Sequence, residues 1–295
     1  MLRTGTCYLK AAFFTLAVTA WILAEATLLP VWGAAPDQQE DICTNAAVIM
    51  CENWEDRALG TSDLGRAKYK NPGWLTTLPQ TGMTVIDASS GNVYNGNRGL
   101  QFRYLQNEEF PGQMETVSPN DYPTLYWRYY TRFSSNWKFS SIGTKGFETV
   151  TQGGQSVYAW WNGAGFTDAN ELAQYTQNVS NPVAYRGNVN GGPFIITPGQ
   201  WYCLELRVTY NTGASNGTIQ FWVDDVLRAD HPNIKVESPA GMTIEGWILS
   251  TYWNMPGTHP LMYRWFDNFV ISRERIGCLS RDTTTPAPPT GLRVN

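Results

Sequence analysis

The chain is poor in charge and in helix-forming patterns. Charged residues are 16% of its 295 residues, whereas soluble domains average about 25%. Its 21 Lys and Arg against 25 Asp and Glu give a formal net charge of −4, which argues against a nucleic-acid binder that depends on bulk positive charge. No window of 12 or more residues shows helical periodicity, and 27 Gly with 17 Pro argue against a coiled coil or helical bundle.

Apolar and aromatic residues are abundant instead. Hydrophobic residues make up 42% of the chain, and 13 Trp, 15 Tyr and 12 Phe make up 14%. A chain of this composition can bury a large core, so we expect a folded rather than a disordered protein. The sequence therefore predicts a β-rich globular domain that carries more Trp and Tyr than its core needs.

The N-terminus predicts an export signal. An apolar run of 13 residues covers 11–23, and Ala24-Glu25-Ala26 has the small-x-small pattern that signal peptidase reads. A membrane anchor would need about 20 apolar residues. We expect a signal peptide over 1–26, cleaved as late as residue 35 in the alternative, then a lead-in segment over 27–50. The protein is expected to be secreted, extracellular or periplasmic, and free of the membrane after cleavage.

The cysteines agree with export. An even number in an oxidising compartment predicts two disulfides, with three connectivities open. The absence of a Cys-x-x-Cys pair and the presence of only two histidines argue against a zinc site. We expect no metal or cofactor; a structural calcium, the open alternative, would use Asp224, Asp225, Asp267 or Asn268. The cysteines of the mature chain are Cys43, Cys51, Cys203 and Cys278.

Alternation of period two recurs in short runs bounded by Gly, Pro, Asn and Asp. Many such runs predict antiparallel strands in two packed sheets, so the fold class is all-β, a jelly-roll sandwich with a concave groove. We place this domain at 51–280 and read the Thr- and Pro-rich segment 281–295 as a tail or linker. The alternating runs are 99–106, 125–133, 201–210, 218–224, 242–253 and 262–272.

The run 125–133 suggests a binding face. Leu125, Trp127 and Tyr129 alternate with tyrosines and arginines, which would stand together on the other side of the strand. Rings that stack on sugar C–H faces, together with Arg forks that pair with carboxylates, suit an acidic polysaccharide. The expected substrate-binding residues are Tyr126, Arg132, Trp160, Trp161, Tyr185 and Arg186.

Five segments together resemble a known family. They are YWRYYTRFSSNW (126–137), GTKG (143–146), GQWYCLELRVTYNTG (199–213), GTIQFWVDD (217–225) and YRWFDNFVIS (263–272). Their order over about 220 residues resembles bacterial polysaccharide lyases with a concanavalin A-like jelly roll, including the alginate and glucuronan lyases and the heparin-lyase-like group. The strand segments mark the fold, and the lysine loop is more telling for function.

The resemblance implies cleavage of a uronate polymer by β-elimination. In the alginate-lyase group the lysine loop reads Gly-Gly-Lys-Leu-Pro-Gly, and here Gly143, Lys145 and Gly146 match it. The group's Ser-x-Arg and Tyr-x-Tyr pairs have no clean counterpart; 156–161 and 175–177 occupy that region.

β-Elimination needs a cation at the uronate carboxylate and groups that move protons. A tyrosine serves as base only when nearby cations stabilise its phenolate. We expect Lys145 and Arg128 at the carboxylate and Tyr175 or Tyr130 in proton transfer, all lining one concave groove.

Two alternatives stay open. The first is a secreted lectin-like module that binds carbohydrate without catalysis, which the abundant Trp fits equally well. The second is a glycoside hydrolase, but the Glu-x-Asp-x-x-Glu strand of jelly-roll endoglucanases is absent from the sequence. We expect a monomer that acts on or binds an anionic polysaccharide.

Overall fold

The computed structural model describes residues 40–60, 82–151, 155–161, 170–177, 182–236, 243–254 and 258–279. These residues all belong to one compact unit of the chain. The predicted signal peptide (1–26), the lead-in segment up to residue 39 and the predicted tail (281–295) lie outside the described residues. Within the described part of the chain, no helix is long and apolar enough to cross a membrane.

Nearly all regular structure is β-strand. Two short 3₁₀ helices, η1 (Asp41–Thr44) and η2 (Ala88–Ser90), accompany the strands. The strands are β1 (Val48–Glu52), β2 (Met83–Asp87), β3 (Arg98–Tyr104), β4 (Gln113–Tyr122), β5 (Thr124–Phe133), β6 (Thr144–Thr151), β7 (Ser156–Trp161), β8 (Glu171–Gln177), β9 (Ala184–Arg186), β10 (Phe194–Ile195), β11 (Trp201–Thr209), β12 (Gly217–Val223), β13 (Val226–Ile234), β14 (Ile244–Ser250) and β15 (Met262–Ser272).

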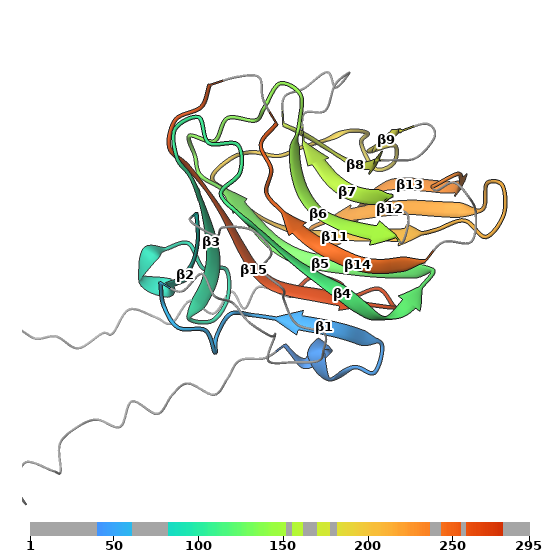
Figure 1. Cartoon of the computed structure of the whole chain (residues 1–295), viewed down its shortest axis with the longest axis horizontal. Helices are drawn as coiled ribbons and strands as arrows, with labels where there is room; N and C mark the ends of the chain where they lie inside the picture. The colour runs from blue at the N-terminus through green and yellow to red at the C-terminus, as the bar shows by residue number, and fades with distance from the viewer. Residues whose placement is uncertain are drawn as a thin grey trace, which may run out of the picture. The chain divides into compact units, whose positions relative to one another are not determined.

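The strands form two antiparallel sheets (Figure 1). The first, sheet A, has the order β13-β12-β11-β5-β15-β3-β2, and β1 also pairs with β15. The second, sheet B, has the order β10-β8-β7-β6-β14-β4, and β9 also pairs with β8. Neighbours far apart in sequence, such as β5 and β15, show that the chain crosses repeatedly between the sheets. The predicted two-sheet jelly roll is confirmed.

The core lies between the sheets and is rich in aromatic residues. Trp127 and Tyr129 on β5 face Phe147 on β6, with ring centroids 5.1 and 6.5 Å apart. Phe102 and Phe221, from β3 and β12, are fully buried in the same cluster. The apolar members of the runs 99–106, 125–133 and 201–210 therefore point inward as predicted. Arg264 in the run 262–272 is an exception, because this polar residue is itself buried in the core.

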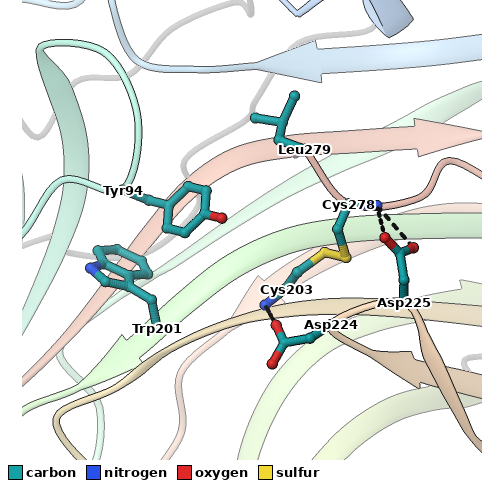
Figure 2. A pocket seen from close by; sticks show the side chains of 7 residues that line it. All are labelled: Tyr94, Trp201, Cys203, Asp224, Asp225, Cys278 and Leu279. Atoms are coloured by element: carbon teal, nitrogen blue, oxygen red, sulfur yellow. Dashed lines mark hydrogen bonds between the residues drawn. A yellow bond between two sulfur atoms is a disulfide. The ribbon is translucent and has the colours of Figure 1, made fainter. Parts of the chain in front are cut away.

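Two disulfides fix the chain ends. Cys43 bonds Cys51 and so ties η1 to β1. Cys203 on β11 bonds Cys278, which holds the segment after β15 against sheet A (Figure 2). The connectivity that the sequence left open is thus settled as one short and one long loop, with sequence separations of 8 and 75 residues.

Candidate active site

Lys145 lies near the start of β6, where its backbone is held from two sides. Its N–H donates to the carbonyl of Tyr252 at 2.8 Å. Its own carbonyl accepts from Arg264 at 3.0 Å, and Arg264 also donates to the Thr131 hydroxyl at 3.2 Å. The Arg264 guanidinium is wholly buried, with its central carbon 4.5 Å from the Trp161 ring centroid. A rigid interior cation therefore fixes the backbone from which Lys145 projects.

The residue after Lys145 has to be small. A Cβ added to Gly146 would lie 2.6 Å from the ring of Trp161 and 2.9 Å from the Cβ of Ala159. The pairing of β6 with β7 also shifts register between Lys145 and Glu148. Glycine here lets the irregular strand lie directly on the buried Trp161 ring.

The ammonium group of Lys145 has three defined neighbours. It donates to Oε1 of Gln177 at 2.9 Å and lies 3.9 Å from Oε2 of Glu148. It also stands 4.5 Å from the ring centroid of Tyr158, within cation–π range. These contacts hold the cation over the outer face of sheet B.

Tyr158 and Tyr175 face each other across β7 and β8. They are register partners, with ring centroids 5.5 Å apart. Val157 and Ala159 are in the core, so Tyr158 points outward by strand alternation. Burial, with Glu148 and Tyr175 as smaller causes, raises the pKa of Tyr158. Its phenol therefore stays protonated at neutral pH and can donate a hydrogen bond.

These side chains border a cavity of about 430 Å³. Tyr252 forms part of its wall and donates to Oε2 of Glu109 at 2.7 Å. That bond, together with burial, raises the pKa of Tyr252. The cavity thus combines one ammonium group, phenols and amides. It is lined by Lys145, Tyr158, Tyr175, Gln177, Tyr252 and Asn254.

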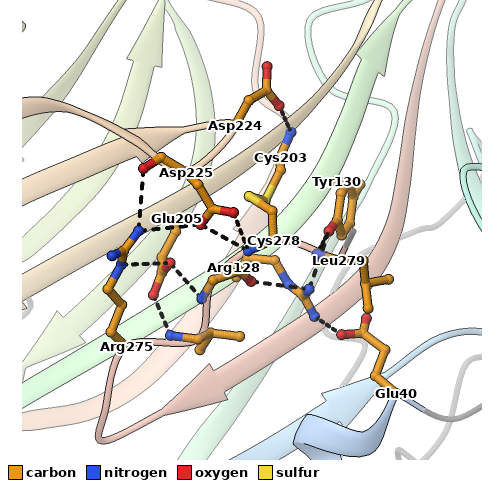
Figure 3. Close-up of a disulfide and its surroundings, with 12 residues drawn as sticks. Glu40, Arg128, Tyr130, Cys203, Glu205, Asp224, Asp225, Arg275, Cys278 and Leu279 are labelled. Carbon is orange, nitrogen blue, oxygen red and sulfur yellow. Dashed lines mark hydrogen bonds and ion pairs between the residues drawn. A yellow bond between two sulfur atoms is a disulfide. The ribbon is translucent and has the colours of Figure 1, made fainter. Parts of the chain in front are cut away.

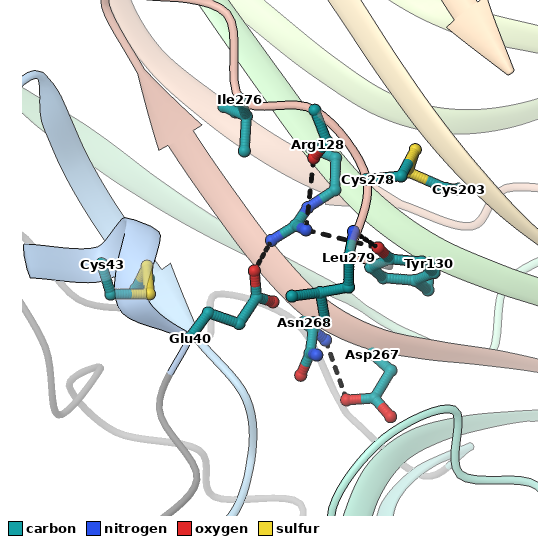
Figure 4. Close-up of polar contacts among 12 residues, drawn as sticks. Glu40, Cys43, Arg128, Tyr130, Cys203, Asp267, Asn268, Ile276, Cys278 and Leu279 are labelled. Carbon is teal, nitrogen blue, oxygen red and sulfur yellow. Dashed lines mark hydrogen bonds and ion pairs between the residues drawn. A yellow bond between two sulfur atoms is a disulfide. The ribbon is translucent and has the colours of Figure 1, made fainter. Parts of the chain in front are cut away.

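Lys145 and Tyr175, two of the four predicted catalytic residues, do meet at this cavity. Arg128 does not, because it lies on the outer face of β5 in sheet A (Figure 3). Its guanidinium is 1% exposed and is paired with Glu40. It also donates to the carbonyl of Gly277 at 3.5 Å. Figure 4 shows the guanidinium of Arg128 between Glu40 and Tyr130. The prediction that Arg128 binds substrate beside Lys145 is wrong, because Arg128 lies on sheet A, where Glu40 and the segment after β15 cover it.

Tyr130 also lies away from the cavity, because it stands on the same outward face of β5 in sheet A as Arg128. Its hydroxyl accepts from the backbone N–H of Leu279 and from Arg128 at 3.4 Å. Burial raises its pKa. The prediction that Tyr130 shares one groove with Lys145 and Tyr175 is therefore also wrong.

The other two predicted residues of this strand, Tyr126 and Arg132, share its outward face. The Arg207 guanidinium lies 5.5 Å from the Tyr126 ring centroid. Arg132 donates to the carbonyls of Gly199 and Gly91 at 2.9 and 3.1 Å. Both residues are thus on sheet A rather than at the sheet B cavity, which corrects their predicted place.

The remaining predicted binding residues have mixed outcomes. Trp161 is fully buried, and Tyr185 is 9% exposed in the same core, so neither is an exposed ring as predicted. Arg186 lies in β9 and is paired with Glu171. Trp160 pairs through its backbone with Lys145, but its side chain lies outside the described residues.

Several cavity residues were not singled out by the sequence. Tyr158 could have been found, because Val157, Ala159 and Trp161 form an apolar alternation that turns Tyr158 outward beside the lysine strand. Tyr252, Gln177 and Asn254 gave no such signal, since their position depends on which strands become neighbours.

The three aspartates among the four calcium candidates accept hydrogen bonds from the backbone in this structure. Asp224 accepts from Cys203 N–H at 2.9 Å, and Asp225 accepts from Cys278 N–H at 3.1 Å. Asp267 accepts from the N–H groups of Tyr94, Asn95 and Asn268 at 2.8 to 3.1 Å. Among the described residues, no group of three or more His, Cys, Asp or Glu could hold a metal ion.

No family model matches the chain, and no curated protein matches it. Solved structures do resemble it. Endo-β-1,4-glucuronan lyase from the fungus Trichoderma reesei superposes with a TM-score of 0.52 at 14% identity, over 76% of this chain and 94% of that one. The alginate lyase Aly36B gives 0.52 at 19% identity over 79% and 99%, and a doubly substituted form of it has been solved with an alginate trisaccharide. The cellulose-induced protein Cip1 gives 0.51 at 16% identity over 78% and 100%. At these identities the likeness is one of fold: this chain shares a two-sheet jelly roll with these structures.

Proposed function

We propose that this protein is a secreted polysaccharide lyase that cleaves a uronate-containing polysaccharide by β-elimination at the sheet B cavity. One observation carries the proposal: the Lys145 ammonium projects over the cavity beside Tyr158 and Tyr175. A cation next to two phenols is the minimum set that this chemistry requires. The shared fold with alginate and glucuronan lyases supports the reaction class.

In this proposal the uronate carboxylate binds Lys145. The proton on the carbon beside the carboxylate is removed, and its electron pair forms the new C=C bond. The bond to the 4-linked oxygen then breaks, and that oxygen takes up a proton. Lys145 stabilises the negative charge that develops on the carboxylate, and Gln177 holds the ammonium in place.

The two tyrosines take different roles. Tyr158 stays protonated because its burial raises its pKa, so it donates a hydrogen bond to the substrate. Tyr175 is assigned the proton transfer. Secretion is supported by the two disulfides, which form and persist in oxidising compartments.

The test is an assay of the full-length mature protein on alginate, glucuronan, heparin-type and pectic polymers, following absorbance of the unsaturated uronate. Lys145→Ala is expected to lower kcat/KM by roughly 10²-fold or more. Tyr175→Phe is expected to lower kcat by roughly 10²- to 10⁴-fold with little change in KM. Matched controls are Lys235→Ala, an exposed lysine, and Tyr126→Phe on sheet A; both should leave the rate unchanged.

The outcomes separate the alternatives. Absorbance that rises on one polymer and is abolished by Lys145→Ala supports the lyase. Polymer binding with neither new absorbance nor new reducing ends would mean a lectin-like module. New reducing ends without absorbance would mean hydrolysis and would contradict the proposal.

A further inference from the structure

A second cavity, of about 300 Å³, lies on the outer side of sheet A (Figure 2). Trp201 and Tyr94 form one wall, and the Cys203–Cys278 disulfide with Asp224 and Asp225 forms the other. Trp201 points away from the core because the next residue of β11, Tyr202, packs into it. Nothing in the proposed lyase chemistry uses these residues.

The aromatic wall is rigid. The Tyr94 ring stacks on Tyr130 with centroids 3.9 Å apart and an interplanar angle of 19°. Trp201 meets Tyr94 edge-on at 5.6 Å and 65°. The Tyr94 backbone N–H is held by the buried carboxylate of Asp267 at 2.8 Å. Both rings remain partly exposed, so they form a fixed aromatic corner open to a ligand.

The acidic wall is equally fixed. Asp224 and Asp225 form the two-residue turn between β12 and β13, both with positive φ, 50° and 64°. Asp224 accepts from Cys203 N–H at 2.9 Å, and Asp225 accepts from Cys278 N–H at 3.1 Å. Arg275 also pairs with Asp225, its guanidinium nitrogen lying 3.3 Å from Oδ1. These contacts hold the carboxylate groups at the cavity edge, where their oxygens can accept further hydrogen bonds.

We propose that this cavity binds a neutral carbohydrate. Aromatic rings offer a surface for the apolar C–H face of a pyranose, and carboxylates accept hydrogen bonds from its hydroxyls. Counting the residues that the structure describes, the cavity edge carries two carboxylates against the one guanidinium of Arg275, so a uronate would meet net negative charge, which disfavours it. A metal ion fits less well, because the described lining offers only two carboxylates and the facing wall consists of rings, which are not oxygen ligands.

This site is independent of the sheet B cavity. Trp201 stands on the outer face of sheet A, whereas Lys145, Tyr158 and Tyr175 stand on the outer face of sheet B, with the core between them. The proposal therefore does not rest on the lyase activity. Its consequence is that the protein can attach to a neutral glycan while the opposite face acts on an acidic one.

The test is isothermal titration of the full-length mature protein with cellohexaose, xylohexaose and mannohexaose, and with a glucuronan hexasaccharide for comparison. At least one neutral hexasaccharide is expected to bind. Trp201→Ala should weaken that binding roughly tenfold or more, which corresponds to about 1.4 kcal/mol. Asp224→Asn should weaken it about fivefold, because it removes the charge while Asn keeps an acceptor and tolerates positive φ.

Two controls make the result specific. Tyr263→Ala removes a partly exposed ring from another part of sheet A, and Lys145→Ala alters the sheet B cavity; both should bind the neutral hexasaccharide as the unmodified protein does. If thermal unfolding shows that Trp201→Ala is not folded, the binding of Trp201→Phe and Asp224→Asn decides whether the proposal holds. The proposal is overturned if no neutral hexasaccharide binds, if binding is lost in Lys145→Ala, or if the variants at Trp201 and Asp224 bind normally. Glucuronan binding that Trp201→Ala abolishes would overturn the assignment to neutral sugars.

Discussion

At the scale of single residues, alternation predicts which side chains leave the core, but not what covers them afterwards. Arg128 points outward from β5 as the sequence indicates, yet it is buried by Glu40 from one chain end and by Gly277 from the other. Lys145 points outward from β6 and stays at a cavity. Both strands carry an outward-pointing cation, and what distinguishes the two cations is whether distant segments, here those that contain Glu40 and Gly277, cover them.

Gly146 offers a residue-scale prediction. Gly146→Ala should destabilise the protein by about 1–3 kcal/mol, because the new methyl would press on the Trp161 ring and force the strand away from it. Displacement of this strand should also move Lys145 and lower any activity at the cavity. The matched control is Gly213→Ala, where the nearest atom to the new Cβ would lie 3.8 Å away. Equal unfolding midpoints for the two variants in guanidinium would contradict the prediction.

At the scale of strands, much of the fold is predictable and the site is only partly so. The runs 125–133 and 262–272 correspond to β5 (Thr124–Phe133) and β15 (Met262–Ser272). Their period-two patterns define strand and inward face, because one side must pack against apolar neighbours. The assignment of strands to sheets is not encoded locally. Strands β5 and β6 follow one another in sequence yet belong to different sheets, and for that reason the predicted single groove divides into two faces.

The Cys203–Cys278 bond gives a prediction at the same scale. Replacing both cysteines by serine frees the segment after β15 from β11 and should cost about 4.5 kcal/mol by loop entropy. The Cys43–Cys51 bond closes a far shorter loop, with a separation of 8 residues against 75. Its removal should cost about 2.5 kcal/mol.

Guanidinium unfolding of the two double variants under oxidising conditions measures both costs. The free energy of unfolding is expected to be highest for the unmodified protein, lower for the variant lacking Cys43–Cys51, and lowest for the variant lacking Cys203–Cys278. The reverse order of the two variants would show that packing around the short loop, rather than chain entropy, dominates.

At the scale of the whole molecule, the net charge is a poor guide to the binding surfaces. The formal charge is −4, yet the sheet B cavity carries an ammonium group and the sheet A cavity carries two carboxylates. Part of the negative charge is not at the surface at all. Glu52, Glu205 and Asp267 are buried, the last two with no exposed area. The acidity of the chain therefore bears more on its pH-dependent stability than on its partner.

These buried carboxylates predict that acidification from neutral pH stabilises the protein. Burial raises the pKa of Glu52 and of Glu205, and it raises that of Asp267 well above its ordinary value. At a pH between the pKa of such a carboxyl in the unfolded state and its higher pKa in the folded state, the folded protein binds more protons than the unfolded protein. The stabilisation is complete below the unfolded pKa and is lost as pH rises through the folded pKa, by up to about 1.4 kcal/mol per pH unit for each proton.

Guanidinium unfolding at pH 7, 6 and 5 should therefore give a free energy of unfolding that rises toward pH 5. In Asp267→Asn the slope should be shallower, and because both histidines are common to the two proteins, the difference in slope isolates Asp267. Parallel pH profiles for the two proteins would refute the contribution assigned to this carboxylate.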